Sequence, residues 1–231
     1  MSSTNNKPSG FFSQLLFNII IPVVILTRFS GEAHLGPTLG VIVALLFPLG
    51  FGLWERKKTG KFNFLSALGF VSVLLTGGIS LLELDAKYIA IKEAAIPGLI
   101  GVAVIVSQYT KYPLLKTMLF NESVMDIKKI EQALEQKGNR EKLPKIQVIA
   151  SNILAGSFFL SSVLNYVLAK MIVVSPAGTE AYNNELGRMT ALSYPVIVLP
   201  TMVLFFAALF YLFSSLKKLT GLKVEEMLIE Q

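Results

Sequence analysis

The sequence of 231 residues contains no cysteine and only one histidine, His34. Disulfides, thiolate metal sites and cysteine nucleophiles are therefore excluded, and a histidine metal cluster cannot form within one chain. A Ser-His-Asp arrangement would depend on His34, which lies in a turn between two apolar stretches. No phosphate-binding loop, dinucleotide fingerprint or zinc-protease motif occurs. We therefore expect no metal, no cofactor and no enzymatic activity.

Charged residues are also few, at 16% of the chain against about 25% in a typical soluble protein. Crossing a bilayer core of about 30 Å takes roughly 20 mostly apolar residues, and several uncharged stretches reach that length with their flanks. The sequence therefore predicts an all-α, polytopic membrane helix bundle. Five stretches have no acidic or basic residue: Pro37–Leu53, Phe64–Leu82, Ala94–Ser107, Ile146–Ala169 and Ser193–Leu216.

The hydrophobic pattern predicts about six transmembrane helices. The first is short and contains Asn18 and Pro22, so a helix lying in the membrane interface is the alternative there. Because the polar segment before it lacks a small-residue cleavage site, we expect a retained span rather than a signal peptide. The spans pair into three hairpins, of which the second and third resemble one another. The predicted spans cover residues 11–28, 36–54, 62–82, 89–110, 146–172 and 193–216.

Basic residues are distributed unevenly over the connections between the spans. If both termini are cytoplasmic, the cytoplasmic segments hold sixteen of the 21 Lys and Arg residues, and the external segments and span ends hold five. Cytoplasmic loops of membrane proteins carry such an excess, so we expect this orientation. The net charge of +6 then indicates a lipid bilayer with anionic head groups as partner, and not nucleic acid.

We expect a single membrane domain at 11–220, with cytoplasmic tails at 1–10 and 221–231. A cytoplasmic amphipathic helix is predicted at about 123–137, and a short external surface helix at Thr179–Thr190. The cytoplasmic helix can be capped by Ser123, and its polar face carries lysines. We expect its apolar face to bind the membrane surface; that face presents Val124, Ile127, Ile130 and Leu134 at helical spacing.

Several segments resemble those of a known family. Thr76-Gly77-Gly78-Ile79-Ser80-Leu81-Leu82, then Tyr88-Ile89 and Lys92, then Tyr112-Pro113-Leu114-Leu115-Lys116-Thr117-Met118-Leu119 resemble the intracellular septation protein A family of bacterial inner membranes. The segments 62–69, 92–97 and 185–195 are similar to an uncharacterised branch of about this length, sometimes labelled transporter-like.

This resemblance covers most of residues 11–220. It implies a multi-pass bacterial inner-membrane protein with a non-enzymatic role in cell-envelope maintenance or septation, and other envelope proteins as partners. It supplies no catalytic residue. The inserted helix at 123–137 and the longer loop at 175–190 depart from the shorter septation proteins.

Lys92 and Glu93 lie near the external end of the fourth predicted span. A charge at mid-bilayer costs at least about 2.5–3.5 kcal/mol on insertion scales, so such residues are candidates for a functional site. A boundary role is the alternative, since a lysine can extend its ammonium group to the membrane surface. Glu93 is too short for this and requires a partner, for which Arg188 and Lys92 are the candidates.

Ser157, Ser161 and Asn165 follow one another at four-residue intervals and form a polar stripe on the fifth span. They can hydrogen-bond across helices or line a wet cavity. The shallow charges, this stripe and the prolines in the spans support an alternative function, a small carrier for a solute or lipid. A water-accessible cavity would favour the carrier, and a dry, well-packed bundle would favour the structural protein.

Overall fold

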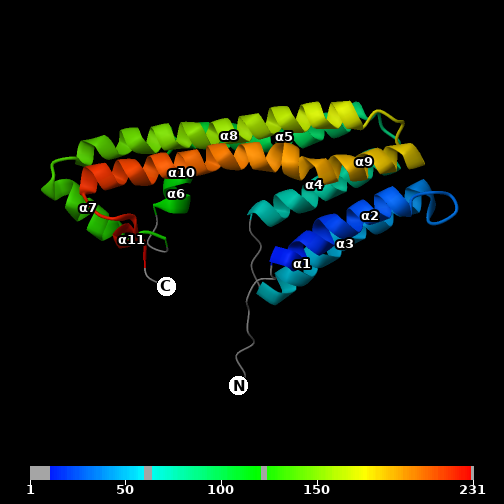
Figure 1. The fold of residues 1–231 in the computed structure, drawn as a ribbon, viewed down its shortest axis with the longest axis horizontal. Helices are drawn as coiled ribbons and strands as arrows, with labels where there is room; N and C mark the ends of the chain where they lie inside the picture. Colours follow the sequence, from blue (N-terminus) through cyan, green and yellow to red (C-terminus); the bar gives the residue numbers. More distant parts are fainter. Residues whose placement is uncertain (1–10, 60–63, 121–123, 230–231) are drawn as a thin grey trace, which may run out of the picture. The chain divides into compact units, whose positions relative to one another are not determined.

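The computed structural model describes residues 11–59, 64–120 and 124–229, and this part of the chain is helical (Figure 1). It contains no strand beyond one isolated antiparallel bridge. The all-α prediction is confirmed for these residues. The elements are α1 (Phe11–Leu15), η1 (Leu16–Ile20), α2 (Ile21–Arg28), α3 (Gly36–Thr59), α4 (Phe64–Leu81), α5 (Lys87–Ser107), α6 (Leu114–Leu119), α7 (Ile127–Gln136), η2 (Arg140–Lys142), α8 (Leu143–Ile172), α9 (Glu180–Ser193), η3 (Tyr194–Val198), α10 (Leu199–Thr220) and α11 (Val224–Met227).

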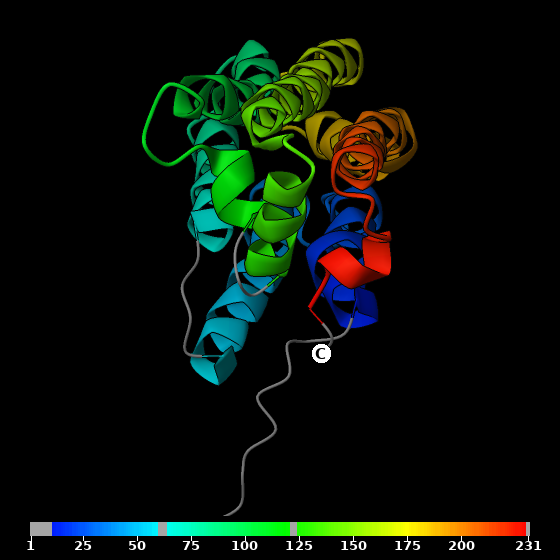
Figure 2. The same cartoon turned by 90° about the vertical axis from the view of Figure 1, so that its left-hand side faces the viewer.

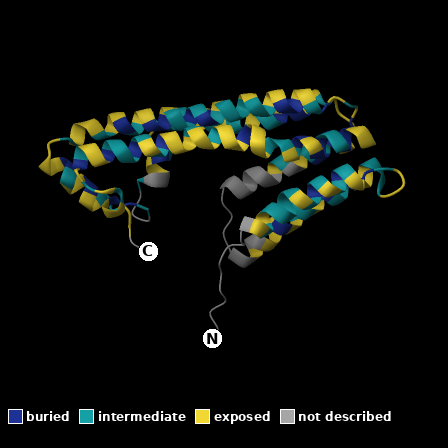
Figure 3. Ribbon diagram, viewed as in Figure 1, coloured by how far each residue is buried: buried dark blue, intermediate teal, exposed yellow. Residues whose placement is uncertain are grey.

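Four helical segments among the described residues are long and apolar enough to cross a membrane: Gly36–Trp54, Lys87–Ser107, Arg140–Ile172 and Glu180–Thr220. In the most apolar 18-residue stretch of each, between 17% and 28% of the residues are buried, so most residues of these stretches are exposed or only partly buried (Figure 3). Lipid accommodates such surfaces, whereas a soluble protein rarely exposes them. The segment Phe12–Arg28 is apolar but shorter.

Two π-helical turns accompany prolines. The turn η1 ends two residues before Pro22, whereas η3 contains Pro195 and ends two residues before Pro200. Proline lacks a backbone N–H, and its ring collides with the carbonyl group four residues earlier in a regular helix. A π turn relieves this by widening the helix locally. Residues 11–28 and 180–220 therefore remain continuous helices.

The described chain divides into two compact units. Unit 1 contains residues up to Ile96 together with Leu164–Ile197, and unit 2 contains Pro97–Val163 together with the residues from Val198 onward. In unit 1, α2 packs against both α3 and α9. Its core includes Leu26, Ala44, Ile89, Tyr182 and Leu186.

The helix expected at the external surface is a core element of unit 1. Thr179 caps α9 by accepting a hydrogen bond from the backbone N–H of Tyr182 at 3.1 Å. A Cβ atom on Gly187 would lie 2.8 Å from Cγ2 of Thr27, so glycine allows α9 to approach α2 closely. The predicted short helix at Thr179–Thr190 is present as α9, with Glu180, Ala181 and Arg188 exposed. Its other face is buried in unit 1 and consists of Tyr182, Asn183, Leu186, Gly187 and Met189.

In unit 2, α8 and α10 lie side by side (Figures 1 and 2), and α7 packs against α10. Asp126 caps α7 by accepting from the backbone N–H of Lys129 at 3.0 Å; the predicted cap, Ser123, lies outside the described residues. Ile130 and Leu134 are buried in the core of unit 2. The expectation that this face binds the membrane surface is wrong, because protein covers it.

The residues after α10 fold back onto the segment before α7. Gly221 ends α10 in the left-handed conformation, with φ at 75°, which glycine adopts readily. The backbone N–H of Asp126 donates to the carbonyl oxygen of Met227 at 2.9 Å, next to an antiparallel bridge between Met125 and Leu228. Met227 is fully buried. Residues 221–229 are thus a folded part of unit 2.

Candidate functional site

One face of α4 carries three hydroxyl groups. Ser72, Thr76 and Ser80 are spaced four residues apart, which aligns them along the helix. The hydroxyl of Thr76 donates to the carbonyl oxygen of Ser72 at 3.0 Å, and that of Ser80 donates to the carbonyl oxygen of Thr76 at 2.9 Å. Because these protons are used within the helix, the oxygen atoms of Thr76 and Ser80 remain available as acceptors.

Lys92 on α5 reaches this row of hydroxyls. Its ammonium nitrogen lies 2.8 Å from Oγ1 of Thr76, 3.4 Å from Oγ of Ser72 and 2.6 Å from Oε1 of Glu93. Lys92 is only 8% exposed, and the side chain of Glu93 is 24% exposed. A lysine ammonium group has three donors, and here each has an acceptor. The buried cation is therefore both paired and fully hydrogen-bonded, as burial of a charge requires.

A second polar contact extends the row to α9. The hydroxyl oxygens of Ser80 and Tyr182 lie 3.1 Å apart in the interior of unit 1, and Tyr182 is fully buried. Since the proton of Ser80 is directed to the carbonyl group of Thr76, Tyr182 donates in this bond. Three helices, α4, α5 and α9, thus contribute to one network, which we call the Lys92 network: Ser72, Thr76, Ser80, Lys92, Glu93 and Tyr182.

The first turn of α5 begins at Lys87, about one and a half helical turns before Lys92. Oδ1 of Asp85 accepts a hydrogen bond from the backbone N–H of Lys87 at 2.8 Å, and Oδ2 lies 3.3 Å from the Lys87 ammonium. The backbone N–H, assisted by the ammonium group, lowers the pKa of Asp85 below its ordinary value. This exposed pair fixes the first turn of the helix that carries Lys92.

Of the predicted site residues, the structure joins Lys92 and Glu93 in an ion pair. Arg188 lies on α9 with an exposed side chain, and the ion pairs found among the described residues do not include it. The carboxylate of Glu93 therefore pairs with Lys92, which was one of its two candidate partners, and not with Arg188.

The stripe on α8 includes residues of both units. Ser157 and Ser161 belong to unit 2, whereas Asn165 belongs to unit 1. Ser157 is buried, and its hydroxyl donates to the carbonyl oxygen of Leu154 in the same helix at 2.7 Å. A Cβ atom on Gly101 would lie 3.1 Å from the ring of Phe159, so α5 and α8 pack closely here. These contacts favour packing over the lining of a wet cavity.

The sequence did not indicate Ser72, Thr76, Ser80 or Tyr182 as site residues. The four-residue spacing that marks Ser157 and Ser161 is equally present on α4, and it would have identified the three hydroxyls. Tyr182 gives no comparable signal, because its contact with Ser80 depends on how α9 packs within unit 1.

The network has the chemistry of a fixed ion pair. The described part of the chain has no group of three or more Asp, Glu or His side chains able to hold a metal ion. The residues that line a cavity in the same unit include none of the network. Comparison with protein-family models, characterised proteins and solved structures finds no match to this chain, so the functional argument rests on these residues.

Proposed function

We propose that the chain is a multi-pass protein of a bacterial inner membrane with six transmembrane helices and both termini in the cytoplasm. Its role is non-enzymatic and concerns cell-envelope maintenance or septation. Four membrane-length helices support the membrane location. The segment 11–28 and the 18-residue helix α4 supply the other two spans and complete three hairpins. The uneven distribution of Lys and Arg supports the orientation.

The observation that carries a structural role is the closed state of the Lys92 network. Inside a bilayer an ionisable side chain commonly lines a transport path, but a transported ligand needs an open approach to it. Here the ammonium group of Lys92 is surrounded by Glu93, Thr76 and Ser72. The charge thus holds α4 and α5 together, as expected for a rigid membrane scaffold. The resemblance to the septation protein A family supplies the physiological context, with envelope proteins as partners.

The second candidate is a small carrier for a solute or lipid. This function is favoured by the partial exposure of the Glu93 side chain, 24%. A partly exposed carboxylate can move away from Lys92 and leave the ammonium group accessible to a ligand. In this function the pair separates during each cycle, and Lys92 or Glu93 contacts the ligand.

Replacement of both charges distinguishes the two functions. The double variant Lys92→Met/Glu93→Gln removes the ion pair without leaving a single buried charge, an exchange that proteins often tolerate. For a scaffold, this variant should restore normal cell length and envelope integrity to a bacterium whose own copy of the gene is deleted. Single variants that leave one charge unpaired should reach lower membrane abundance.

Microscopy of cell length, survival after osmotic downshift and immunoblots of membranes provide the readouts. A double variant that is present at normal abundance but fails to restore the cells would contradict the scaffold and favour the carrier. A deletion strain with unchanged cell length and survival would contradict the envelope role.

A further inference from the structure

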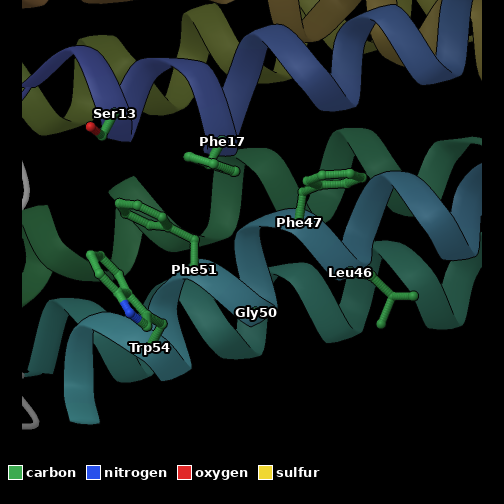
Figure 4. A pocket seen from close by; sticks show the side chains of 7 residues that line it. All are labelled: Ser13, Phe17, Leu46, Phe47, Gly50, Phe51 and Trp54. Atoms are coloured by element: carbon green, nitrogen blue, oxygen red, sulfur yellow. The ribbon is translucent and has the colours of Figure 1, made fainter. Parts of the chain in front are cut away.

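Unit 1 contains a cavity of about 380 Å³ between the helix 11–28 and α3 (Figure 4). Its walls are mostly aromatic, with the rings of Phe17 and Phe51 stacked at 5.4 Å and 14°. The rings of Phe51 and Trp54 lie 5.8 Å apart at 40°. Phe47 and Leu46 add further apolar surface, and Ser13 is the polar residue of the lining. We call this cavity the aromatic groove. Its size and apolar lining are those of a small-molecule site.

The aromatic groove is open to the outside of the protein along α3. A Cβ atom added to Gly50 would meet no atom within 4 Å, so the wall at Gly50 is bare backbone beside empty space. Leu46 and Trp54, one helical turn to either side, are 57% and 52% exposed. A chain-like apolar molecule can therefore enter from the surface of a membrane-length helix.

Three basic residues follow the groove after a single acidic residue, Glu55. Arg56, Lys57 and Lys58 are consecutive in α3, and Lys57, three residues after Trp54, is exposed. Tryptophan favours the membrane interface, where its ring bridges apolar and polar surroundings. A cluster of basic residues immediately cytoplasmic of a membrane span attracts anionic head groups. An apolar groove that is followed in the sequence by a basic segment is thus complementary to a molecule with an apolar tail and an anionic head.

We propose that the aromatic groove binds one acyl chain of an anionic phospholipid, whose phosphate group is attracted by the basic sequence Arg56-Lys57-Lys58. The inference rests on the proposed membrane location and on the cytoplasmic position of residues 55–61. It deepens the scaffold function, because a bound anionic lipid links the helix 11–28 to α3 at the cytoplasmic leaflet. A zwitterionic phospholipid and a second copy of the chain are the competing occupants.

Trp54 is the only tryptophan of the chain, so its fluorescence reports on the groove without labelling. The full chain is reconstituted into vesicles of phosphatidylcholine and phosphatidylglycerol, with bromine atoms on the acyl chains of one lipid or the other. Bromine quenches the indole only at close range. Brominated phosphatidylglycerol should quench Trp54 several-fold more effectively than brominated phosphatidylcholine at equal mole fraction, and added salt should reduce this preference.

Two sets of variants separate the head group from the acyl chain. The triple change Arg56→Gln/Lys57→Gln/Lys58→Gln should make the two brominated lipids equally effective. Gly50→Leu should fill the groove and weaken quenching by both lipids. Gly52→Leu is the matched control, because a Cβ atom on Gly52 also meets open space but Gly52 does not line the groove; its quenching should equal that of the native chain.

Equal quenching of the native chain by both lipids would overturn the anionic preference and leave only ordinary lipid contact. Equal effects of Gly50→Leu and Gly52→Leu would overturn the groove as the binding site. A vesicle-inserted chain whose Trp54 neither lipid quenches would show that protein, such as a second copy, covers the groove. A chain that fails to insert into vesicles at all would instead contradict the membrane location.

Discussion

The side-chain oxygens of Ser80 and Tyr182 lie 3.1 Å apart in the interior of unit 1, although the two residues are 102 positions apart in the sequence. This bond connects α4 with α9. Because α4 also provides the hydroxyls that hold Lys92, the same helix face stabilises contacts with two different parts of the chain. If the network stabilises the fold, removal of this bond should lower the stability of the protein.

Tyr182→Phe and Ser80→Ala should each lower the free energy of unfolding by about 1 kcal/mol, since each removes a buried hydrogen bond. The double variant should lose less than the sum of the single changes, because both act on one contact. Thermal unfolding in detergent, followed by circular dichroism, measures this. Tyr109→Phe, at a position 88% exposed, is the control and should have no effect. Fully additive losses would show that the two hydroxyls are not coupled.

Lys92→Met should destabilise the protein by about 1–3 kcal/mol, because it leaves the partly buried Glu93 carboxylate without its hydrogen-bonded cation. Lys87→Met on the same helix is the matched control. It removes the exposed pair with Asp85 and should change stability little, since surface ion pairs contribute little. Melting temperatures of the two purified variants in the same detergent provide the comparison. Equal shifts in melting temperature for the two variants would show that the buried ion pair of Lys92 stabilises the protein no more than the exposed pair of Lys87.

Met227→Ala should destabilise unit 2 by about 2–5 kcal/mol, the usual cost of truncating a fully buried large side chain. Leu228→Ala, at a neighbouring position 38% exposed, should cost much less. Amide hydrogen exchange at Asp126, whose N–H is bonded to the carbonyl oxygen of Met227, should accelerate in the first variant only. Unchanged protection there would mean that residues 221–229 contribute nothing to unit 2.

The absence of native cysteine allows the topology to be mapped with single cysteines. Lys57→Cys and Lys128→Cys should react with a membrane-impermeant maleimide only after the cells are permeabilised. Ala181→Cys should react in intact cells. All three positions are exposed on the protein, so protection reflects the membrane. Reaction of Lys57→Cys and Ala181→Cys from the same side would contradict the six-span arrangement.

The lowered pKa of Asp85 predicts a pH dependence of stability. A carboxyl group with a lower pKa in the folded state stabilises that state above its unfolded pKa of about 4, and this contribution disappears as the pH falls through the folded pKa. Asp85→Ala should therefore lower the melting temperature at neutral pH and have progressively less effect below about pH 4. If Asp85→Ala lowered the melting temperature by the same amount at every pH, the charged carboxylate of Asp85 would not be the source of the stabilisation.

The positions of the helices could be predicted because long runs without charge leave few alternatives. The predicted spans at 36–54 and 146–172 lie within α3 and α8. The surroundings of α7 could not be predicted in the same way. Its buried face consists of Ile130 and Leu134, and such a face fits a membrane surface or a protein core equally well. Only the fold of unit 2 decides between them.

The candidate site was predictable in part. Lys92 and Glu93 could be found as charges within an apolar span, and the hydroxyls of α4 follow a readable spacing. The partner of Glu93 could not be derived, because Arg188 and Lys92 are equally plausible by charge and differ only in where tertiary packing leaves them. The role of Tyr182 depends on the same packing.

The order of the residues around Lys92 has a consequence for biogenesis. Ser72 and Thr76 leave the ribosome before Lys92, so the acceptors for the ammonium group precede the cation. If α5 entered a bilayer alone, Lys92 and Glu93 would face lipid at a considerable cost. With α4 already beside it, the cation meets its hydroxyls as it arrives. We therefore expect α4 and α5, joined by residues 82–86, to enter the membrane together as a helical hairpin.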